Sequence, residues 1–265
     1  MPSIFAYQSA EVDWCEENFK HSEYIAEYYN TVSNIAFFIF PPLMLWLNTQ
    51  YNSYRSAPLR CFVIIEMIIG VFSVYFHSTL SYAGQMLDEL SIMWAFGTCY
   101  AFWLPSHHLP GFIKNRDQFI WMVAIVTIFI TLMSFLKPTL NAYVLNTFIF
   151  HFLYLTFQEV KTNRKRFPYL HRMALTMTGW WTIAIVCWIV DRFLCEFCHK
   201  INFRYLHSLW HIFILIAVHH AVTLITFCDV FYDLSCSELE VVYWPRNFGP
   251  LALPYVVFQR SNKSY

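Results

Sequence analysis

The chain has 265 residues and a formal net charge of zero, and 58% of its residues are hydrophobic and 20% aromatic. Charged residues make up 13% of the chain, whereas soluble domains usually carry about 25%. So few charges cannot cover a water-facing surface, which excludes a soluble globular protein, and the zero net charge argues against nucleic acid as a partner. We therefore expect the lipid bilayer to be the solvent for most of the chain.

The first thirty residues are polar and acidic and lack the basic start and apolar core of a signal peptide. They contain the run Asp13-Trp14-Cys15-Glu16-Glu17-Asn18, followed by Glu27. Dense carboxylates, an amide and backbone carbonyls suit calcium, a hard cation that takes oxygen ligands. Acidic clusters are, however, more often plain solvated surface, so the composition alone leaves a calcium site as one of two interpretations.

Seven apolar runs follow, each close to the roughly 20 residues that a helix needs to cross a bilayer. Backbone polar groups in lipid must be satisfied within their own segment, so these runs are predicted to be helices. We predict an all-α membrane protein with a single domain, 1–265, made of a lumenal segment at 1–30, a helix bundle at 31–228 and a cytosolic tail at 229–265. The expected spans are 31–49, 60–79, 87–105, 118–136, 140–159, 173–191 and 207–228.

The distribution of basic residues between the loops predicts the orientation. If the N-terminus is outside the cytosol, twelve of the 17 Lys and Arg residues fall on the inner side, most densely in 161–172. Inner loops carry the excess of Lys and Arg in membrane proteins. The sequence therefore predicts a lumenal N-terminus and a cytosolic C-terminus, and a glycosylation sequon at Asn262-Lys263-Ser264 that stays unused.

Histidines mark the start of the last predicted span, His207-Ser-Leu-Trp-His211. Residues four apart share one helix face, so this pair can hold one metal ion. The second span ends with Ser73-Val-Tyr-Phe-His77, again with its two polar residues four apart. The predicted topology brings this end and the start of the seventh span to the same side of the membrane. Three histidines and a water are a common ligand set for catalytic zinc.

A general base is still needed, because the His207–His211 pair lacks the glutamate of the soluble metalloprotease motif H-E-x-x-H. Asp88, near the start of the third span on the same membrane side, is the expected supplier. Three cysteines, Cys15, Cys195 and Cys198, also fall on the lumenal side, where disulfides persist. A bond from Cys15 to either of the other two would tie the acidic segment to the loop before the seventh span.

Taken together, these motifs resemble the alkaline ceramidases, which are seven-span intramembrane amidases, and the resemblance runs over essentially the whole chain. The matching segments are D-W-C-E-x-N at Asp13–Asn18, Ser73-x-x-x-His77 with Asp88 following, the loop Asp191–Glu196, and His207-x-x-x-His211.

The resemblance implies roles for these residues and a reaction. The reaction is hydrolysis of the amide bond of ceramide to sphingosine and a free fatty acid, calcium-dependent and with an alkaline pH optimum, in the endoplasmic reticulum membrane, with the Golgi as second choice. It implies a membrane-embedded enzyme with no obligate protein partner. The implied sites are zinc on His77, His207 and His211, catalysis by Asp88 and Ser73, calcium on Asp13, Trp14 (through its backbone carbonyl), Glu16, Asn18 and Glu27, and a disulfide between Cys15 and Cys195.

Two other classes of seven-helix protein compete with this interpretation. A receptor could use the pair Asp191-Arg192, but that pair falls on the lumenal side, and the seventh span lacks an Asn-Pro turn. A transporter could use buried histidines and acids as a proton path, but it would be expected to show paired, similarly interrupted halves. The sequence therefore favours the hydrolase.

Overall fold

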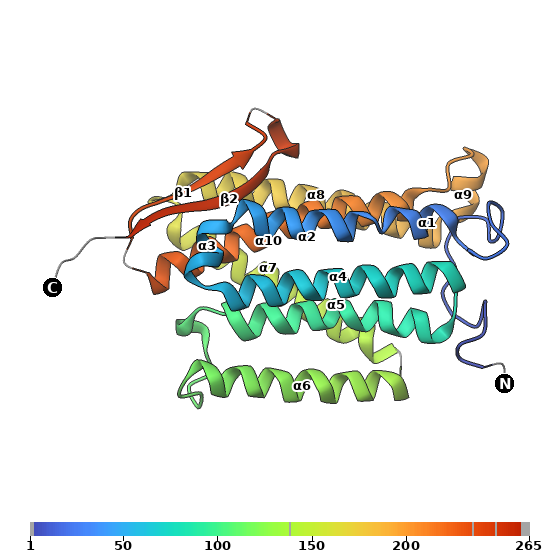
Figure 1. Cartoon of the computed structure of the whole chain (residues 1–265), viewed down its shortest axis with the longest axis horizontal. Coiled ribbons are helices and arrows are strands. Elements are labelled where there is room, and N and C mark those ends of the chain that lie inside the picture. The colour runs from blue at the N-terminus through green and yellow to red at the C-terminus, as the bar shows by residue number, and fades with distance from the viewer. Residues whose placement is uncertain (1–2, 138, 235, 247, 261–265) are drawn as a thin grey trace.

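The computed structural model describes residues 3–137, 139–234, 236–246 and 248–260. Its long helices run side by side, with the N-terminal loop and α9 at one end and a β-hairpin near the other (Figure 1). The helical elements are α1 (Tyr28–Ser33), α2 (Ala36–Leu47), α3 (Thr49–Tyr54), α4 (Ser56–Thr79), α5 (Tyr82–Trp103), η1 (Ser106–His108), α6 (Arg116–Leu136), α7 (Thr139–Asn163), α8 (Pro168–Phe193), α9 (Cys195–Lys200), α10 (Leu206–Asp233) and η2 (Gly249–Leu251).

The predicted apolar runs all fall on helical segments. The first is split into α1 and α2, because the backbone N–H groups of Asn34 and Ile35 bond to carbonyls three residues back rather than four. Within the described residues, five helical segments are long and apolar enough to cross a membrane; α5 and α7 fall outside this set. The five are 28–47, α4, α6, α8 and α10. The structure thus has several candidate spans, and the full count of seven stays a prediction.

A tight connection joins α4 to α5 and sets how their ends meet. Leu80 closes α4 in the left-handed conformation, with φ of 48°, and Ser81 caps α5 by accepting a hydrogen bond from the Gly84 backbone N–H at 3.1 Å. A Cβ at Gly84 would lie 2.9 Å from the Cα of Phe76, so only glycine allows the two helices to approach this closely. The last turn of α4 and the first turns of α5 therefore lie side by side.

Helix α10 is the best-buried helix of the bundle, with α8 packed along it. Buried residues occur throughout its length, from His207 to Val230, and include histidines, threonines and aspartate as well as apolar side chains. The helix continues to Asp233, five residues past the predicted end of the last span. Polar groups at its start are therefore held inside the protein rather than exposed to lipid.

The tail corrects the all-α expectation. Strands β1 (Cys236–Trp244) and β2 (Leu253–Arg260) form an antiparallel hairpin whose second strand packs on α10 and α3. Val256 and Phe258 are buried in the main apolar core, whereas Val257 between them is exposed, the alternation of a half-buried strand. The Pro254 carbonyl accepts hydrogen bonds from His219 Nε2 at 2.9 Å and from the Thr223 hydroxyl at 2.9 Å. The tail was missed because a search for twenty-residue apolar runs does not detect period-two alternation over eight residues.

Candidate metal centre

Three histidines from two helices meet at the end of the bundle that holds the N-terminal loop. His77 lies in the last turn of α4, and His207 and His211 lie one turn apart at the start of α10. The three side chains are buried, and each offers one ring nitrogen within 4.8 Å of those of the other two. Their ring centroids are 4.8 to 5.2 Å apart. The sequence prediction that these histidines converge is confirmed.

Hydrogen bonds on the far side of two rings fix which nitrogen is free. Glu27 Oε2 lies 2.5 Å from His77 Nδ1, so an ionised Glu27 accepts the Nδ1–H. The Ser33 hydroxyl donates to the Asn30 carbonyl at 2.9 Å and, with its only proton used, accepts from His211 Nδ1, 2.7 Å away. Both rings are therefore held with a lone pair on Nε2. Histidine ligands of metals commonly bond through the other nitrogen to a carboxylate or similar acceptor.

The free nitrogens fit a metal ion. His77 Nε2, His207 Nδ1 and His211 Nε2 are buried and have no hydrogen-bond partner among the described residues. A buried polar atom without a partner is costly, at about 1–3 kcal/mol each. Each of these three histidines also offers one ring nitrogen within 4.8 Å of the others, and three imidazoles are a donor set that zinc takes in catalytic sites. The residues present therefore fit zinc, and the hydrogen bonds on His77 and His211 leave Nε2 of both rings available to it.

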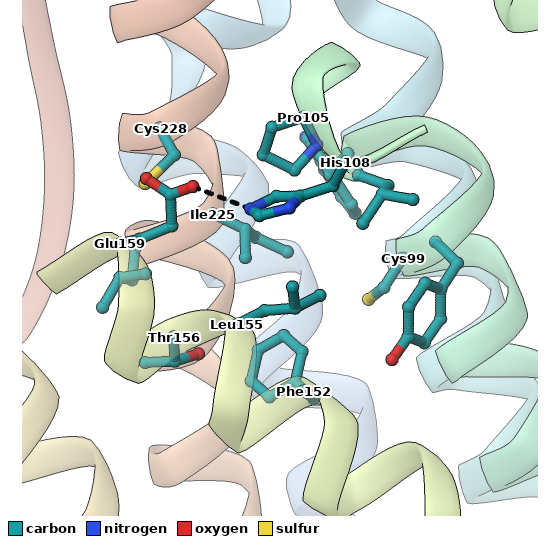
Figure 2. Close-up of a pocket in the computed structure, with 13 residues that line it drawn as sticks. Cys99, Pro105, His108, Phe152, Leu155, Thr156, Glu159, Ile225 and Cys228 are labelled. Carbon is teal, nitrogen blue, oxygen red and sulfur yellow. Dashed lines mark hydrogen bonds and ion pairs between the residues drawn. The ribbon is translucent and has the colours of Figure 1, made fainter. Parts of the chain in front are cut away.

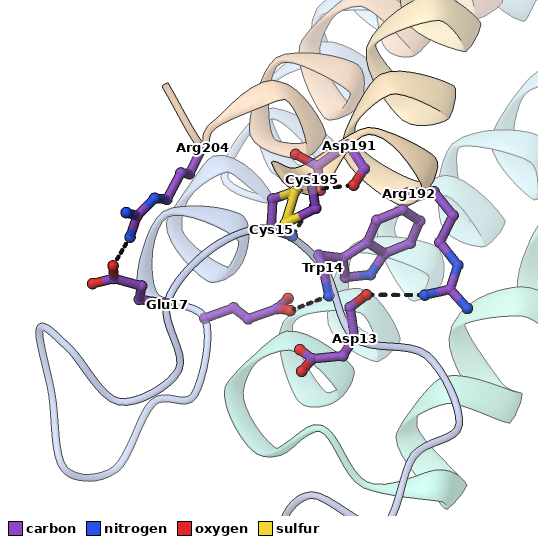
Figure 3. Close-up of a disulfide and its surroundings, with 9 residues drawn as sticks. Asp13, Trp14, Cys15, Glu17, Asp191, Arg192, Cys195 and Arg204 are labelled. Carbon is purple, nitrogen blue, oxygen red and sulfur yellow. Dashed lines mark hydrogen bonds and ion pairs between the residues drawn. A yellow bond between two sulfur atoms is a disulfide. The ribbon is translucent and has the colours of Figure 1, made fainter. Parts of the chain in front are cut away.

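The N-terminal segment closes over these histidines. The Trp14 ring stacks on the His207 ring, with centroids 3.7 Å apart. A disulfide links Cys15 to Cys195, which confirms the pairing implied by the resemblance, and Figure 3 shows it beside Asp191. The Asp191 carboxylate accepts the backbone N–H of Cys15 at 3.0 Å. The segment is thus fixed to the start of α9 and the end of α8, directly beside the imidazoles.

Ser73 and Asp88 lie next to each other in the same region. Ser73 is buried one helical turn before His77, and its hydroxyl interacts with the half-buried Asp88 carboxylate on α5. Asp88 is also close enough to Glu27 to feel its charge. Asp88 does not, however, belong to the group whose ligand atoms lie within 4.8 Å of one another. This placement suits a group that acts on a bound water or substrate rather than a fourth ligand.

The five residues implied to bind calcium are brought into one segment but not into one tight cluster. The Asn18 side-chain amide donates to both oxygens of Asp13 at 3.2 Å, and its own oxygen is buried without a partner. Glu27 interacts with Asp13 and accepts the Trp14 backbone N–H at 3.1 Å.

The Glu16 carboxylate accepts the backbone N–H groups of Tyr29 and Asn30 at 2.6 and 2.8 Å, so it is held at the start of α1. Burial raises the pKa of Glu16, and it raises the pKa of Glu27 to about 8. A cation beside these carboxylates would favour their ionised forms. The described carboxylates are not grouped within 4.8 Å as the histidines are, so calcium binding here stays a prediction.

Sequence reasoning missed three features of the site. The Ser33 hydroxyl bonds to the His211 ring, and the Asn30 side-chain oxygen accepts the Ser208 hydroxyl at 2.7 Å. Glu27 contacts His77 as well as the acidic segment. One signal was available. Glu27, Asn30 and Ser33 are spaced three apart at the start of an apolar run, and this spacing places polar side chains on one face of a helix. Such a stripe facing a protein interior predicts partners on a neighbouring helix.

Comparison with known proteins assigns the family. The family model for ceramidases matches residues 6–257. The chain belongs to the ceramidase family. It is similar to alkaline ceramidase 1 of Homo sapiens, with 47% identity over 99% of both chains, and of Mus musculus, with 46% identity over all of this chain and 96% of the relative. An alkaline ceramidase of Drosophila melanogaster is 35% identical over 97% of this chain and 90% of its own. The ceramidase match includes every site residue described above, from Asp13 to His211.

Proposed function

We propose that this protein hydrolyses the amide bond of ceramide and releases sphingosine and a free fatty acid. The observation that carries the proposal is the meeting of three imidazole nitrogens, buried and without partners, in a chain of the ceramidase family. Membership of an enzyme family favours this function over a receptor or a transporter, neither of which needs such a donor set.

His77, His207 and His211 would hold a zinc ion. When bound, zinc supplies Lewis acidity that lets a water act as a nucleophile near neutral pH. Glu27 and Ser33 keep the ligand nitrogens of His77 and His211 unprotonated by accepting hydrogen bonds from the opposite nitrogens. Trp14 covers one face of His207 and shields it from water. These contacts thus orient the two rings and leave their Nε2 atoms available to a cation.

Asp88 would take the proton from the attacking water and pass it to the leaving amine, as a general base and then a general acid. The Ser73 hydroxyl interacts with the Asp88 carboxylate in the resting state. Once Asp88 holds the proton, it is a weaker acceptor than an oxyanion, and the hydroxyl can donate to the oxyanion that forms on the amide carbonyl. One such donor is worth about 3 kcal/mol of barrier.

Calcium would bind the acidic N-terminal segment through the Asp13, Glu16, Asn18 and Glu27 side chains and the Trp14 carbonyl. It would neutralise the carboxylates and hold the segment against the histidines, a structural and activating role. In this proposal the seven helical segments all cross the endoplasmic reticulum membrane, the metal centre faces the lumen, and the hairpin lies in the cytosol. Ceramide, an amide with two long hydrocarbon chains, would reach the site from the bilayer.

Mass-spectrometric product analysis of the purified full-length protein with ceramide tests the proposal. The wild-type protein should release equal amounts of sphingosine and fatty acid, and a zinc chelator should stop the release. His211→Ala should lose the zinc held by the three histidines together with all turnover. Asp88→Asn should keep that zinc and lose turnover by about 100-fold or more, the typical share of a general base.

His171→Ala is the matched control, because His171 is an exposed histidine at the start of α8. It should behave like the wild-type protein in both assays. Full ceramide turnover by a His211→Ala protein would overturn the proposed function.

A further inference from the structure

A second group of histidines and a carboxylate lies far from the metal centre. His107 and His108 form the short helix η1 just after α5, and Glu159 lies in the last turns of α7. Helix α5 has 22 residues, so its two ends are separated by roughly 33 Å at about 1.5 Å per residue. The metal centre adjoins the start of α5 and this group adjoins its end, so the two groups lie at opposite ends of the bundle.

Both rings point the same nitrogen at one oxygen. His107 Nε2 lies 3.1 Å and His108 Nε2 lies 3.2 Å from Glu159 Oε1, and the two ring centroids are 4.2 Å apart. Figure 2 shows His108 directed at the Glu159 carboxylate. Ligand atoms at about 2.0–2.1 Å from a tetrahedral zinc lie roughly 3.3 Å from one another. The spacing between each imidazole nitrogen and the carboxylate oxygen is therefore close to the one that a zinc site requires.

The carboxylate is fixed from behind, as metal-ligating carboxylates commonly are. Glu159 is buried, with 7% of its surface exposed. Its other oxygen, Oε2, accepts the Tyr232 hydroxyl at 2.6 Å and the Asn163 side-chain amide at 3.3 Å. Oε1 is left facing the two imidazoles. The side chains of His107 and His108 are 47% and 28% exposed, so an ion could reach the group from the water phase.

The surroundings do not fit a lipid or another organic ligand. The adjoining cavity, lined by His108, Glu159 and Cys228 among others, measures about 50 Å³, which is too small for an acyl chain. The free Cys228 thiol lies near the Glu159 carboxylate on the inner side of the group (Figure 2). Imidazole and carboxylate donors suit a divalent transition metal.

We infer that His107, His108 and Glu159 form a second, non-catalytic zinc site at the end of the bundle opposite the metal centre. An ion held there joins the loop between α5 and α6 to the end of α7 and, through Tyr232, to α10. Its effect is structural: it ties three elements together at the end of the molecule where the hairpin packs. A site of this kind is independent of ceramide chemistry.

Zinc content and thermal unfolding of the full-length protein test this inference. After removal of metal with a chelator, zinc is added back, excess is removed, and bound zinc is counted by mass spectrometry. The wild-type protein should hold two zinc ions per chain, and His108→Gln and Glu159→Gln should each hold one and keep ceramide turnover. Zinc should raise the unfolding temperature of His211→Ala, which lacks the catalytic set, and this rise should vanish when His108→Gln is added.

His171→Gln serves as the matched control and should keep both ions. A zinc count that is the same in His108→Gln, Glu159→Gln and the wild-type protein would overturn the inference. So would a wild-type count of one that falls to zero in His211→Ala. A failure of the proposed function alone gives a different result, because the zinc count then still responds to Glu159→Gln while no variant cleaves ceramide.

Discussion

The carboxylate of Glu27 contacts the imidazole of His77, with 2.5 Å between Oε2 and Nδ1, and both side chains are completely buried. The same carboxylate accepts the Trp14 backbone N–H through its other oxygen. One side chain therefore joins the acidic N-terminal segment to a histidine of the metal centre. If calcium binds that segment, it acts on the same carboxylate that orients a zinc ligand, which gives a direct route for calcium to affect activity.

Glu27→Gln should weaken zinc binding and the calcium response together. The amide keeps the shape of the side chain but loses the charge that holds the His77 Nδ1–H. Removal of such a partner typically lowers metal affinity by about 10–100-fold, and we expect a loss of that order for zinc here. Zinc retained against a chelator series and ceramide turnover across a calcium titration measure the two effects. Asp13→Asn is the comparison, because Asp13 interacts with Glu27 but is not in the histidine group.

Asp13→Asn should weaken the calcium response and leave zinc binding near the wild-type value. Equal zinc affinity in Glu27→Gln and Asp13→Asn would show that the Glu27–His77 contact does not support the metal centre.

Ser33→Ala should lower zinc affinity without removing a ligand. The hydroxyl accepts from His211 Nδ1 and thereby keeps Nε2 available. Without it the imidazole is free to place its proton on either nitrogen, and we expect a loss of affinity of about 10-fold, at the lower end for such partners. Excess zinc should restore turnover. Ser53→Ala is the control, because the exposed Ser53 hydroxyl donates to the Thr49 carbonyl within α3, away from the histidines. A Ser33→Ala protein indistinguishable from it would contradict the role given to Ser33.

The sequence predicted the metal centre better than it predicted the groups around it. His77, His207 and His211 could be brought together from helix ends alone, because spacing by four and the alternation of span directions place them on one side. The hydrogen bonds from these rings to Glu27 and Ser33 could not be predicted, because they depend on how α1 packs against α4 and α10. A period of three along one helix shows that a polar face exists, but it does not show which partner that face meets.

The hairpin shows a different kind of failure. Its strands, 236–244 and 253–260, are too short and too mixed in polarity to stand out from a polar tail. The strands are held in place by contacts with other elements. The Pro254 carbonyl accepts a hydrogen bond from His219 on α10, and the Val256 N–H donates to Asn48 Oδ1 at 3.3 Å. The bond to Asn48 joins residues 208 positions apart, and the bond to His219 joins residues 35 positions apart, so local pattern alone does not reveal them.

Cys195→Ser should loosen the N-terminal segment. The disulfide closes a loop between positions 180 residues apart, and loss of a native disulfide typically costs about 2–4 kcal/mol. We expect a lower unfolding temperature and a weaker calcium response, because the segment is no longer fixed next to His207. A reducing agent should reproduce both effects in the wild-type protein. Cys61→Ser, which removes a free cysteine, is the control. An unchanged unfolding temperature in Cys195→Ser would show that the disulfide does not stabilise the N-terminal segment.

The membrane orientation can be tested by introducing one new glycosylation site at each end of the bundle. Tyr7→Asn creates an acceptor sequon with Ser9 in the N-terminal segment, where Tyr7 is 53% exposed. Asp117→Thr creates one at Asn115, in the loop before α6 near the opposite end. Because only the lumenal side is glycosylated, Tyr7→Asn should add an endoglycosidase-sensitive mass and Asp117→Thr should not.

The natural sequon at Asn262 lies outside the described residues, and the predicted cytosolic C-terminus leaves it unmodified in the same assay. The disulfide between Cys15 and Cys195 is consistent with this orientation, because disulfides persist in the lumen rather than in the cytosol. A glycan on Asp117→Thr, or on Asn262 of the wild-type protein, with none on Tyr7→Asn, would reverse the orientation. The metal centre would then face the cytosol, and the second histidine group at the end of α5 would face the lumen.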